Sequence, residues 1–184
     1  MKILVIDDRA IHCNAAKAML KDHELAVVST YGEAQNTLLS SSYDVVLTDL
    51  LLPATTDVHG EGTGMVGQEM PLGTTLAFLA LSRGVKYVAV VTDTNHHDHP
   101  ASAAFDVFHA GPSGKNEVFS IGSVRVLCTN HPNDLIYVDE RTFEPVAYDS
   151  LYSVEGEEKY PQLKGLVMAK NWAQILNQLL NAAA

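Results

Sequence analysis

Short apolar runs alternate with helical patterns through the first half of the chain. The run KILVI at residues 2–6 ends at once in Asp7 and Asp8. A continuous apolar run of this length indicates a strand buried on both faces of a parallel sheet. The same rhythm predicts further strands at 25–29, 43–48 and 85–92, and helices at 9–22, 31–40 and 74–82. Strands that alternate with helices predict parallel, right-handed crossovers and a doubly wound α/β sheet.

The regular alternation stops after Thr92. Here we expect a polar loop, a short helix at 101–109, a turn at 111–114, and short strands at 117–121, 124–128, 135–138 and 143–148. A strand at 165–170 and an amphipathic helix from Trp172 then close the chain. We therefore predict one domain over 1–184, with a glycine-rich loop insertion at 54–70 and a β-rich insertion at 111–164 before the last strand.

Composition narrows the class of protein. The 184 residues are 47% hydrophobic and carry a net charge of −10, with only 12 Lys and Arg spread along the chain. A clustered basic surface is what nucleic acid binding requires, so we expect no nucleic acid partner. No apolar run is long enough to span a membrane, and no signal cleavage site follows the first strand, so we expect a cytoplasmic protein whose Cys13 and Cys128 are reduced thiols.

Acidic residues end two of the expected strands. Asp7 and Asp8 follow the first strand and Asp49 follows the third. In a flavodoxin-like sheet with the order 2-1-3-4-5 these strands are neighbours, so their acids converge at the edge where α/β sheets bind ligands. Three adjacent carboxylates repel one another, and Mg²⁺ is the cation that such oxygen ligands suit.

Four segments, in order, carry a resemblance to a known family. ILVIDD, DVVLTDLLLP, VAVVTDT and VMAKNW resemble the successive signature segments of bacterial response-regulator receiver domains in two-component signalling. The resemblance implies a five-stranded parallel sheet flanked by helices, Mg²⁺ held by Asp7 and Asp8, and a phosphoryl group accepted by Asp49. It further implies a hydrogen bond to that group from Thr92, an ion pair from Lys170, and a sensor histidine kinase or another protein as partner.

The chain departs from the family pattern at two places. Asp93 follows Thr92 where the family prefers a small residue, and this added carboxylate opposes a phosphoryl group nearby. Lys170 is followed by Asn171 rather than proline, and about fifty extra residues separate it from Thr92. We take 165–170 as the fifth strand. The alternative is 124–130, which would put His131 in the place of the lysine.

Two other motifs have competing interpretations. The loop residues His96, His97, Asp98 and His99 suit a transition metal, or they form a solvated loop that caps a helix starting at Pro100. Cys128 and His131 are a weak pair of candidate metal ligands. Burial of the Cys128 thiol in the core is the better interpretation. The glycines of GTGMVG (62–67) match a dinucleotide-binding fingerprint in form only, because they do not connect a strand directly to a helix. Two interpretations of this loop remain: a mobile flap over the acids or a plain linker.

Three functions follow from these patterns. The first is a stand-alone, non-enzymatic receiver-like module phosphorylated on Asp49. The second is a degenerate receiver that binds a partner without phosphorylation. The third is a metal-dependent hydrolase that combines the acids with the His96–His99 loop. A haloacid-dehalogenase type of phosphatase is excluded because Leu51 stands where a second aspartate is required.

Overall fold

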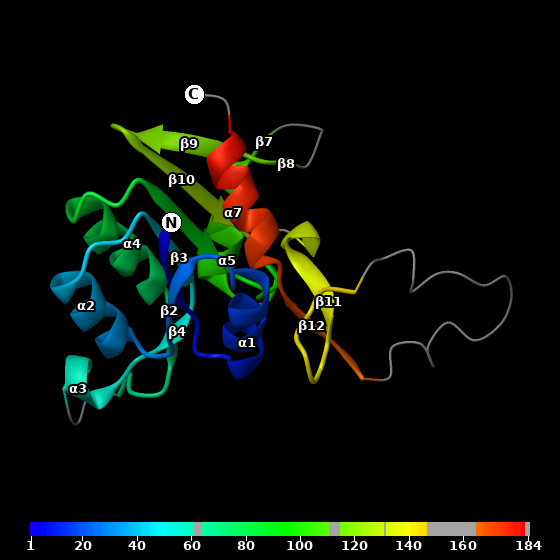
Figure 1. The fold of residues 1–184 in the computed structure, drawn as a ribbon. Coiled ribbons are helices and arrows are strands. Elements are labelled where there is room, and N and C mark those ends of the chain that lie inside the picture. The colour runs from blue at the N-terminus through cyan, green and yellow to red at the C-terminus, as the bar shows by residue number, and fades with distance from the viewer. Residues whose placement is uncertain (61–63, 111–114, 131, 147–164, 183–184) are drawn as a thin grey trace, which may run out of the picture.

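A computed structural model describes residues 1–60, 64–110, 115–130, 132–146 and 165–182. Its centre is a six-stranded sheet in the order β2-β1-β3-β6-β10-β9 (Figure 1). The strands are β1 Lys2–Ile6, β2 Glu24–Val28, β3 Val45–Asp49, β6 Tyr87–Val91, β9 Val118–Ile121 and β10 Val124–Thr129. The first five in spatial order are parallel, and β9 pairs with β10 in the antiparallel sense. The predicted order 2-1-3-4-5 is therefore found, with one extra antiparallel strand at the edge.

The identity of the fifth parallel strand corrects the prediction. This place is taken by β10, which pairs with β6 from Arg125↔Tyr87 to Thr129↔Val91, as in the alternative assignment. The segment expected to be the fifth strand forms β12 Leu166–Lys170, which pairs with β11 Leu135–Asp139 in a separate antiparallel ribbon. The short β-branched run at 124–129 satisfies the buried position next to β6, because Val126 and Leu127 are almost completely buried there. His131 lies outside the described residues.

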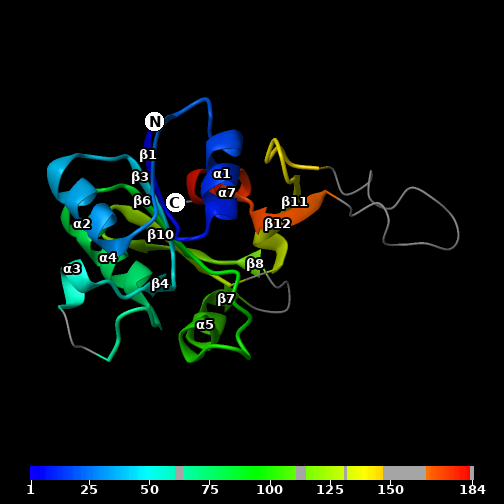
Figure 2. The same cartoon turned by 90° about the horizontal axis from the view of Figure 1, so that it is seen from below.

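Helices cover both faces of the sheet (Figure 2). One face carries α2 Tyr31–Ser40 and α4 Leu72–Ser82, and the other carries α1 Ala10–Met19 and α7 Trp172–Asn181. Each pair buries an apolar cluster against the sheet, with Leu38 and Leu76 in one cluster and Trp172 and Leu179 in the other. The β11–β12 ribbon packs beside α1 on the second face.

The two predicted insertions contain short elements. At 54–70, where only a loop was expected, the described residues form α3 Thr56–His59 and β5 Glu69–Met70. β5 pairs with β4 Leu52–Pro53, which directly precedes the insertion. The expected helix at 101–109 is α5 Pro100–Ala103 followed by a 3₁₀ turn, η1 Ala104–Phe108. It leads into β7 His109–Ala110, which pairs with β8 Lys115–Asn116. A second 3₁₀ turn, η2 Pro132–Asp134, precedes β11.

Of the strand expected at 143–148, the described residues 143–146 form one bridge, between Val138 and Pro145. Phe143 has a positive φ of 58° there, which interrupts an extended strand. Residues 147–164 lie outside the described part of the chain.

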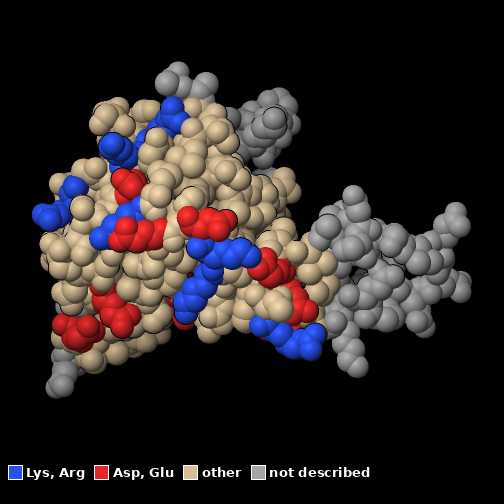
Figure 3. Space-filling view, in the orientation of Figure 1, with Lys and Arg blue, Asp and Glu red and all other residues tan. Residues whose placement is uncertain are grey.

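The charged side chains are mixed in sign over the face in Figure 3. Lys and Arg lie next to Asp and Glu there. An exposed ion pair joins Lys21 to Glu144. In the described part of the chain, no helix is both long enough and apolar enough to cross a membrane.

Candidate functional site

The acids at the ends of β1 and β3 meet, as the strand order predicted. β1 and β3 pair in register from Ile3↔Val45 to Ile6↔Thr48, which brings Asp7 and Asp49 to the same edge of the sheet. Both are buried, and Asp8 beside them is half-buried. Each of the three residues offers an oxygen within 4.8 Å of the oxygens of the other two. The acidic pocket is thus a consequence of parallel pairing, because the carboxyl ends of adjacent parallel strands coincide.

Asp8 does not cap the following helix. The N-cap of α1 is Arg9, which has no side-chain cap, and the Arg9 N–H donates instead to Asp7 Oδ1 at 3.0 Å. Asp8 therefore has no capping role at α1.

A glycine allows α4 to approach the acid-bearing end of β3. A Cβ on Gly73 would lie 1.8 Å from the backbone oxygen of Asp49, so no larger residue fits without moving the backbone. The Gly73 N–H donates to the Leu50 carbonyl at 3.0 Å, and the Leu51 N–H points to Asp49 Oδ1 at 3.4 Å. Backbone contacts therefore fix the Asp49 carboxylate from the side of α4.

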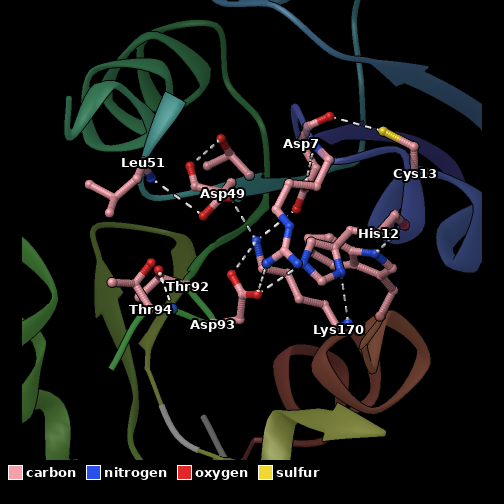
Figure 4. Close-up of polar contacts among 12 residues, drawn as sticks. Asp7, His12, Cys13, Asp49, Leu51, Thr92, Asp93, Thr94 and Lys170 are labelled. Carbon is pink, nitrogen blue, oxygen red and sulfur yellow. Dashed lines mark hydrogen bonds and ion pairs between the residues drawn. The ribbon is translucent and has the colours of Figure 1, made fainter. Parts of the chain in front are cut away.

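The ammonium group of Lys170 lies between two of the acids (Figure 4). Its Nζ is 2.7 Å from Asp7 Oδ2 and 2.9 Å from Asp49 Oδ2, and the lysine is fully buried. Lys170 thus reaches the pocket although its strand does not belong to the central sheet. The strand that carries Lys170 was predicted from the sequence, but its place in a separate ribbon was not.

Side chains of α1 and α7 hold the Lys170 backbone in place. The Lys170 N–H donates to His12 Nδ1 at 3.2 Å, and the Trp172 indole N–H donates to the His12 carbonyl at 2.9 Å. His12 is almost completely buried. We call these contacts the His12 clamp. Sequence analysis missed it, because a histidine on the inner face of a short helix carries no local signal of its partner 158 residues away.

A second network joins the end of β10 to the segment after Lys170. Asp134 accepts from the Thr129 hydroxyl at 2.6 Å and from the Gln178 amide at 2.9 Å, and its backbone oxygen accepts from the Asn171 N–H at 2.7 Å. The strand end at which the family resemblance would put the lysine is therefore linked through Asp134 to the residue that follows Lys170.

Thr92 and Asp93 lie directly after β6, beside β3. Thr92 is buried, and its hydroxyl oxygen accepts from the Thr94 N–H at 3.1 Å. Asp93 forms an ion pair with Arg9, lies 3.2 Å from His12 Nε2, and has one oxygen 4.0 Å from Lys170 Nζ (Figure 4). Because His12 Nδ1 accepts from the Lys170 N–H, the neutral imidazole carries its proton on Nε2 and donates to Asp93. The carboxylate that departs from the family pattern thus has its own counter-charge.

Burial and neighbouring charges change the acidity of the pocket. Burial raises the pKa of Asp49 to about 7, and repulsion from Asp7 adds to this, while the Lys170 ammonium opposes it only in part. Burial and then Asp7 also raise the pKa of Asp8. Burial alone would lower the pKa of Lys170, but attraction to Asp49, Asp7 and Asp93 outweighs it and raises that pKa. Lys170 is therefore a permanent cation.

The pKa of Asp93 moves in the other direction. Burial would raise it, but the hydrogen bond from His12 and the charges of Lys170 and Arg9 outweigh burial and lower it well below the usual range. When every acid is ionised, four carboxylates face the two permanent cations Lys170 and Arg9. The pocket then carries two uncompensated negative charges.

The remaining candidates from the sequence lie as follows. His99 is the N-cap of α5, where its Nδ1 accepts from the Ala101 N–H at 3.1 Å and Pro100 occupies the first turn. Its capping role is therefore confirmed. Cys13 and Cys128 are free, buried thiols, and burial raises their pKa values to about 11 and about 12. Gly62 lies outside the described residues.

Comparisons with known proteins identify no family. No protein-family model matches the sequence, and no curated protein matches it significantly. Among solved structures, the chain is similar to the response regulator protein TrrA from Thermotoga maritima in complex with Mg²⁺-BeF, at 23% sequence identity. This similarity covers 56% of the chain and 81% of that protein, with a TM-score of 0.38. The fold assignment made above depends on strand order and register rather than on this likeness.

Proposed function

We propose that this chain is a receiver-like signalling module that binds Mg²⁺ at Asp7, Asp8 and Asp49 and accepts a phosphoryl group on Asp49. The observation that carries the proposal is the buried triad of Asp7, Asp49 and Lys170, with Lys170 Nζ 2.7 and 2.9 Å from the two acids. A carboxylate nucleophile needs an offset for its own charge and for the incoming phosphoryl charge, and a fixed ammonium supplies part of it.

The donor set fits a small divalent cation. Octahedral Mg²⁺ with ligands at about 2.1 Å places ligand oxygens about 3.0–4.2 Å apart. The three carboxylates already offer oxygens within 4.8 Å of one another, so small side-chain movements suffice. When all four acids are ionised, the two uncompensated charges of the pocket match a divalent ion. Bound there, the ion would offset carboxylate and phosphoryl charge and favour the ionised form of Asp49.

The residues of the chain then have distinct roles. An Asp49 oxygen attacks the phosphorus of a small phosphoryl donor or a phosphohistidine, a new P–O bond forms, and the leaving group departs with the electrons of the broken bond. The Lys170 ammonium shifts from Asp49 toward the phosphoryl oxygens, and the Thr92 hydroxyl donates a hydrogen bond to them. Asp93 does not oppose this group in full, because Arg9 and His12 already pair with it.

One observation favours a second candidate, the degenerate receiver. Lys170 contacts both Asp7 and Asp49, so it occupies oxygens that a cation would use. If this ion pair is permanent, the pocket is a structural core and the module binds its partner without phosphorylation. The hydrolase alternative has less support, since the group of three potential ligands found among the described residues contains acids only.

Intact mass after incubation with acetyl phosphate or phosphoramidate and Mg²⁺ separates the two candidates. We expect one added phosphoryl group, absent without Mg²⁺ and absent in Asp49→Asn. Asp57→Asn, an exposed acid on α3, is the matched control and should be modified like the wild type. An unmodified mass with both donors would support the degenerate receiver.

A further inference from the structure

Two adjacent histidines in the loop after β6 turn their ring nitrogens toward each other. His96 Nε2 and His97 Nε2 are 2.9 Å apart, with ring centroids at 4.0 Å and planes at 60°. The rings meet edge to face rather than stacked, and the two nitrogens lie at hydrogen-bond distance, so one Nε2 donates and the other accepts when no ion is bound. Both residues are exposed, so an ion from solvent can reach them.

Asp106 fixes the tautomer of the neutral His96 ring. Its Nδ1 lies 2.7 Å from Asp106 Oδ2, and since a carboxylate only accepts, Nδ1 carries the proton. The lone pair of the neutral ring is therefore on Nε2, the atom that faces His97. A carboxylate behind one ring nitrogen and a free lone pair on the other is the arrangement typical of metal-binding histidines.

Asp106 is itself held in place. Asn130 Nδ2 donates to Asp106 Oδ1 at 3.0 Å and to the Ser102 carbonyl at 2.8 Å. These two acceptors establish which amide atom is nitrogen, so the other atom is the oxygen. That atom, Asn130 Oδ1, is buried and has no hydrogen-bond partner among the described residues.

His96, Asp106 and Asn130 line one cavity. It has a volume of about 560 Å³, and its walls also include Asp93 and Asn95. Asn95 orders the loop, because its side-chain oxygen accepts from the His97 N–H at 2.9 Å. The cavity has room for several water ligands.

We propose that His96 and His97 bind a divalent transition metal ion, such as Zn²⁺ or Cu²⁺, through their Nε2 atoms, with water completing its coordination. At a metal–nitrogen distance of about 2.05 Å, two nitrogens lie about 2.9 Å apart at a right angle and about 3.3 Å apart at a tetrahedral angle. The observed separation fits the first value, and a small rotation of the exposed His97 ring reaches the second. The site is separate from the acidic pocket and does not depend on phosphorylation of Asp49.

Calorimetric titration of the full chain with Zn²⁺, in excess Mg²⁺, tests the site. We expect one equivalent to bind, and His96→Ala and His97→Ala each to abolish that step. Asp106→Asn should weaken it about 10- to 100-fold, since it removes the carboxylate behind His96. His23→Ala, which removes a histidine from the turn after α1, and Asp49→Asn should leave it unchanged.

Two results would overturn the proposal. Binding that survives both histidine replacements would place the metal elsewhere, and full affinity in Asp106→Asn would reduce the pair to an adventitious surface contact. Electron paramagnetic resonance of the Cu²⁺ form gives an independent readout: splitting from two nitrogens in the wild type, lost in each histidine variant. A spectrum without nitrogen splitting in the wild type would also reject the site.

Discussion

The two halves of the acidic pocket are positioned by different means. Asp7 and Asp49 end strands of the parallel sheet, and the hydrogen-bonded register of β1 with β3 determines where they lie. Lys170 comes from the β11–β12 ribbon outside that sheet. The His12 side chain, itself held by Trp172, accepts from its N–H, and the Asp134 backbone oxygen accepts from the N–H of the next residue. A geometry fixed by backbone pairing tolerates most changes of neighbouring side chains, whereas a geometry held by a few side chains can be lost by a single substitution.

Of the changes considered, replacement of Lys170 should lower the free energy of unfolding the most. In Lys170→Met, the buried Asp7 and Asp49 lose the cation between them, and breaking a buried pair in this way costs about 3–5 kcal/mol. Urea unfolding at pH 8 should show this loss, with part of it regained in Mg²⁺. Lys86→Met removes an exposed lysine and should change little. Equal stability of the two variants would mean that the ion pair contributes nothing.

The part of the pocket that is positioned by the sheet should be disrupted only by changes that displace the backbone. Gly73→Ala puts a Cβ 1.8 Å from the Asp49 backbone oxygen, and we expect about 3 kcal/mol or more of destabilisation by urea unfolding. Gly64→Ala is the matched control, because its Cβ has no atom within 4 Å and its φ is not positive. A fully stable Gly73→Ala protein would show that α4 can move away from β3 at little cost.

Two replacements of His12 separate its hydrogen bond to the Lys170 N–H from its hydrogen bond to Asp93. An asparagine oxygen can take the place of Nδ1 and accept from the Lys170 N–H, whereas a glutamine amide can take the place of Nε2 and donate to Asp93. His12→Gln leaves a buried N–H unsatisfied, which costs about 1–3 kcal/mol, so we expect it to free Lys170 more than His12→Asn does.

Acetylation of Lys170 by acetic anhydride, followed by peptide mass analysis, measures that release without any phosphorylation. The exposed Lys17 serves as the internal reference. The wild type should be protected, and His12→Gln should be labelled fastest. Equal protection in both variants would show that the ribbon alone holds Lys170.

The pH dependence of stability should give the most gradual effect. The pKa of Asp49 is about 7 in the folded protein against 3.8 in the unfolded chain, so between these values the folded state keeps a proton that the unfolded state has lost. The free energy of unfolding should therefore fall as pH rises from about 4 to about 7, by at most about 1.4 kcal/mol per pH unit. Asp49→Asn should flatten this slope. A slope that persists in the variant would belong to another group.

Prediction from the sequence was accurate for the part of the pocket positioned by the sheet and less accurate for the part positioned by the ribbon. The apolar runs predicted β1, β3 and β6 and the meeting of Asp7 with Asp49, because parallel pairing of neighbouring strands is a local consequence of pattern and topology. The fifth strand was assigned wrongly, because both 124–129 and 165–170 are short, largely apolar runs and only contacts across the molecule choose between them. His12 and Asp134 were missed for a related reason. His12 contacts Lys170 and Trp172, and Asp134 contacts Asn171 and Gln178, and these partners are all more than 30 residues away along the chain.

By itself, the sequence determined the alternating α/β order, the acids at the strand ends and the helices that cover the sheet, since residue periodicity encodes which faces are buried. Only the tertiary structure decided that Lys170 enters the pocket from a separate ribbon, that Asp93 is paired with Arg9 and His12, and that His96 and His97 face each other. These are contacts between side chains brought together by packing, and their distances depend on the whole arrangement of the core rather than on any local pattern.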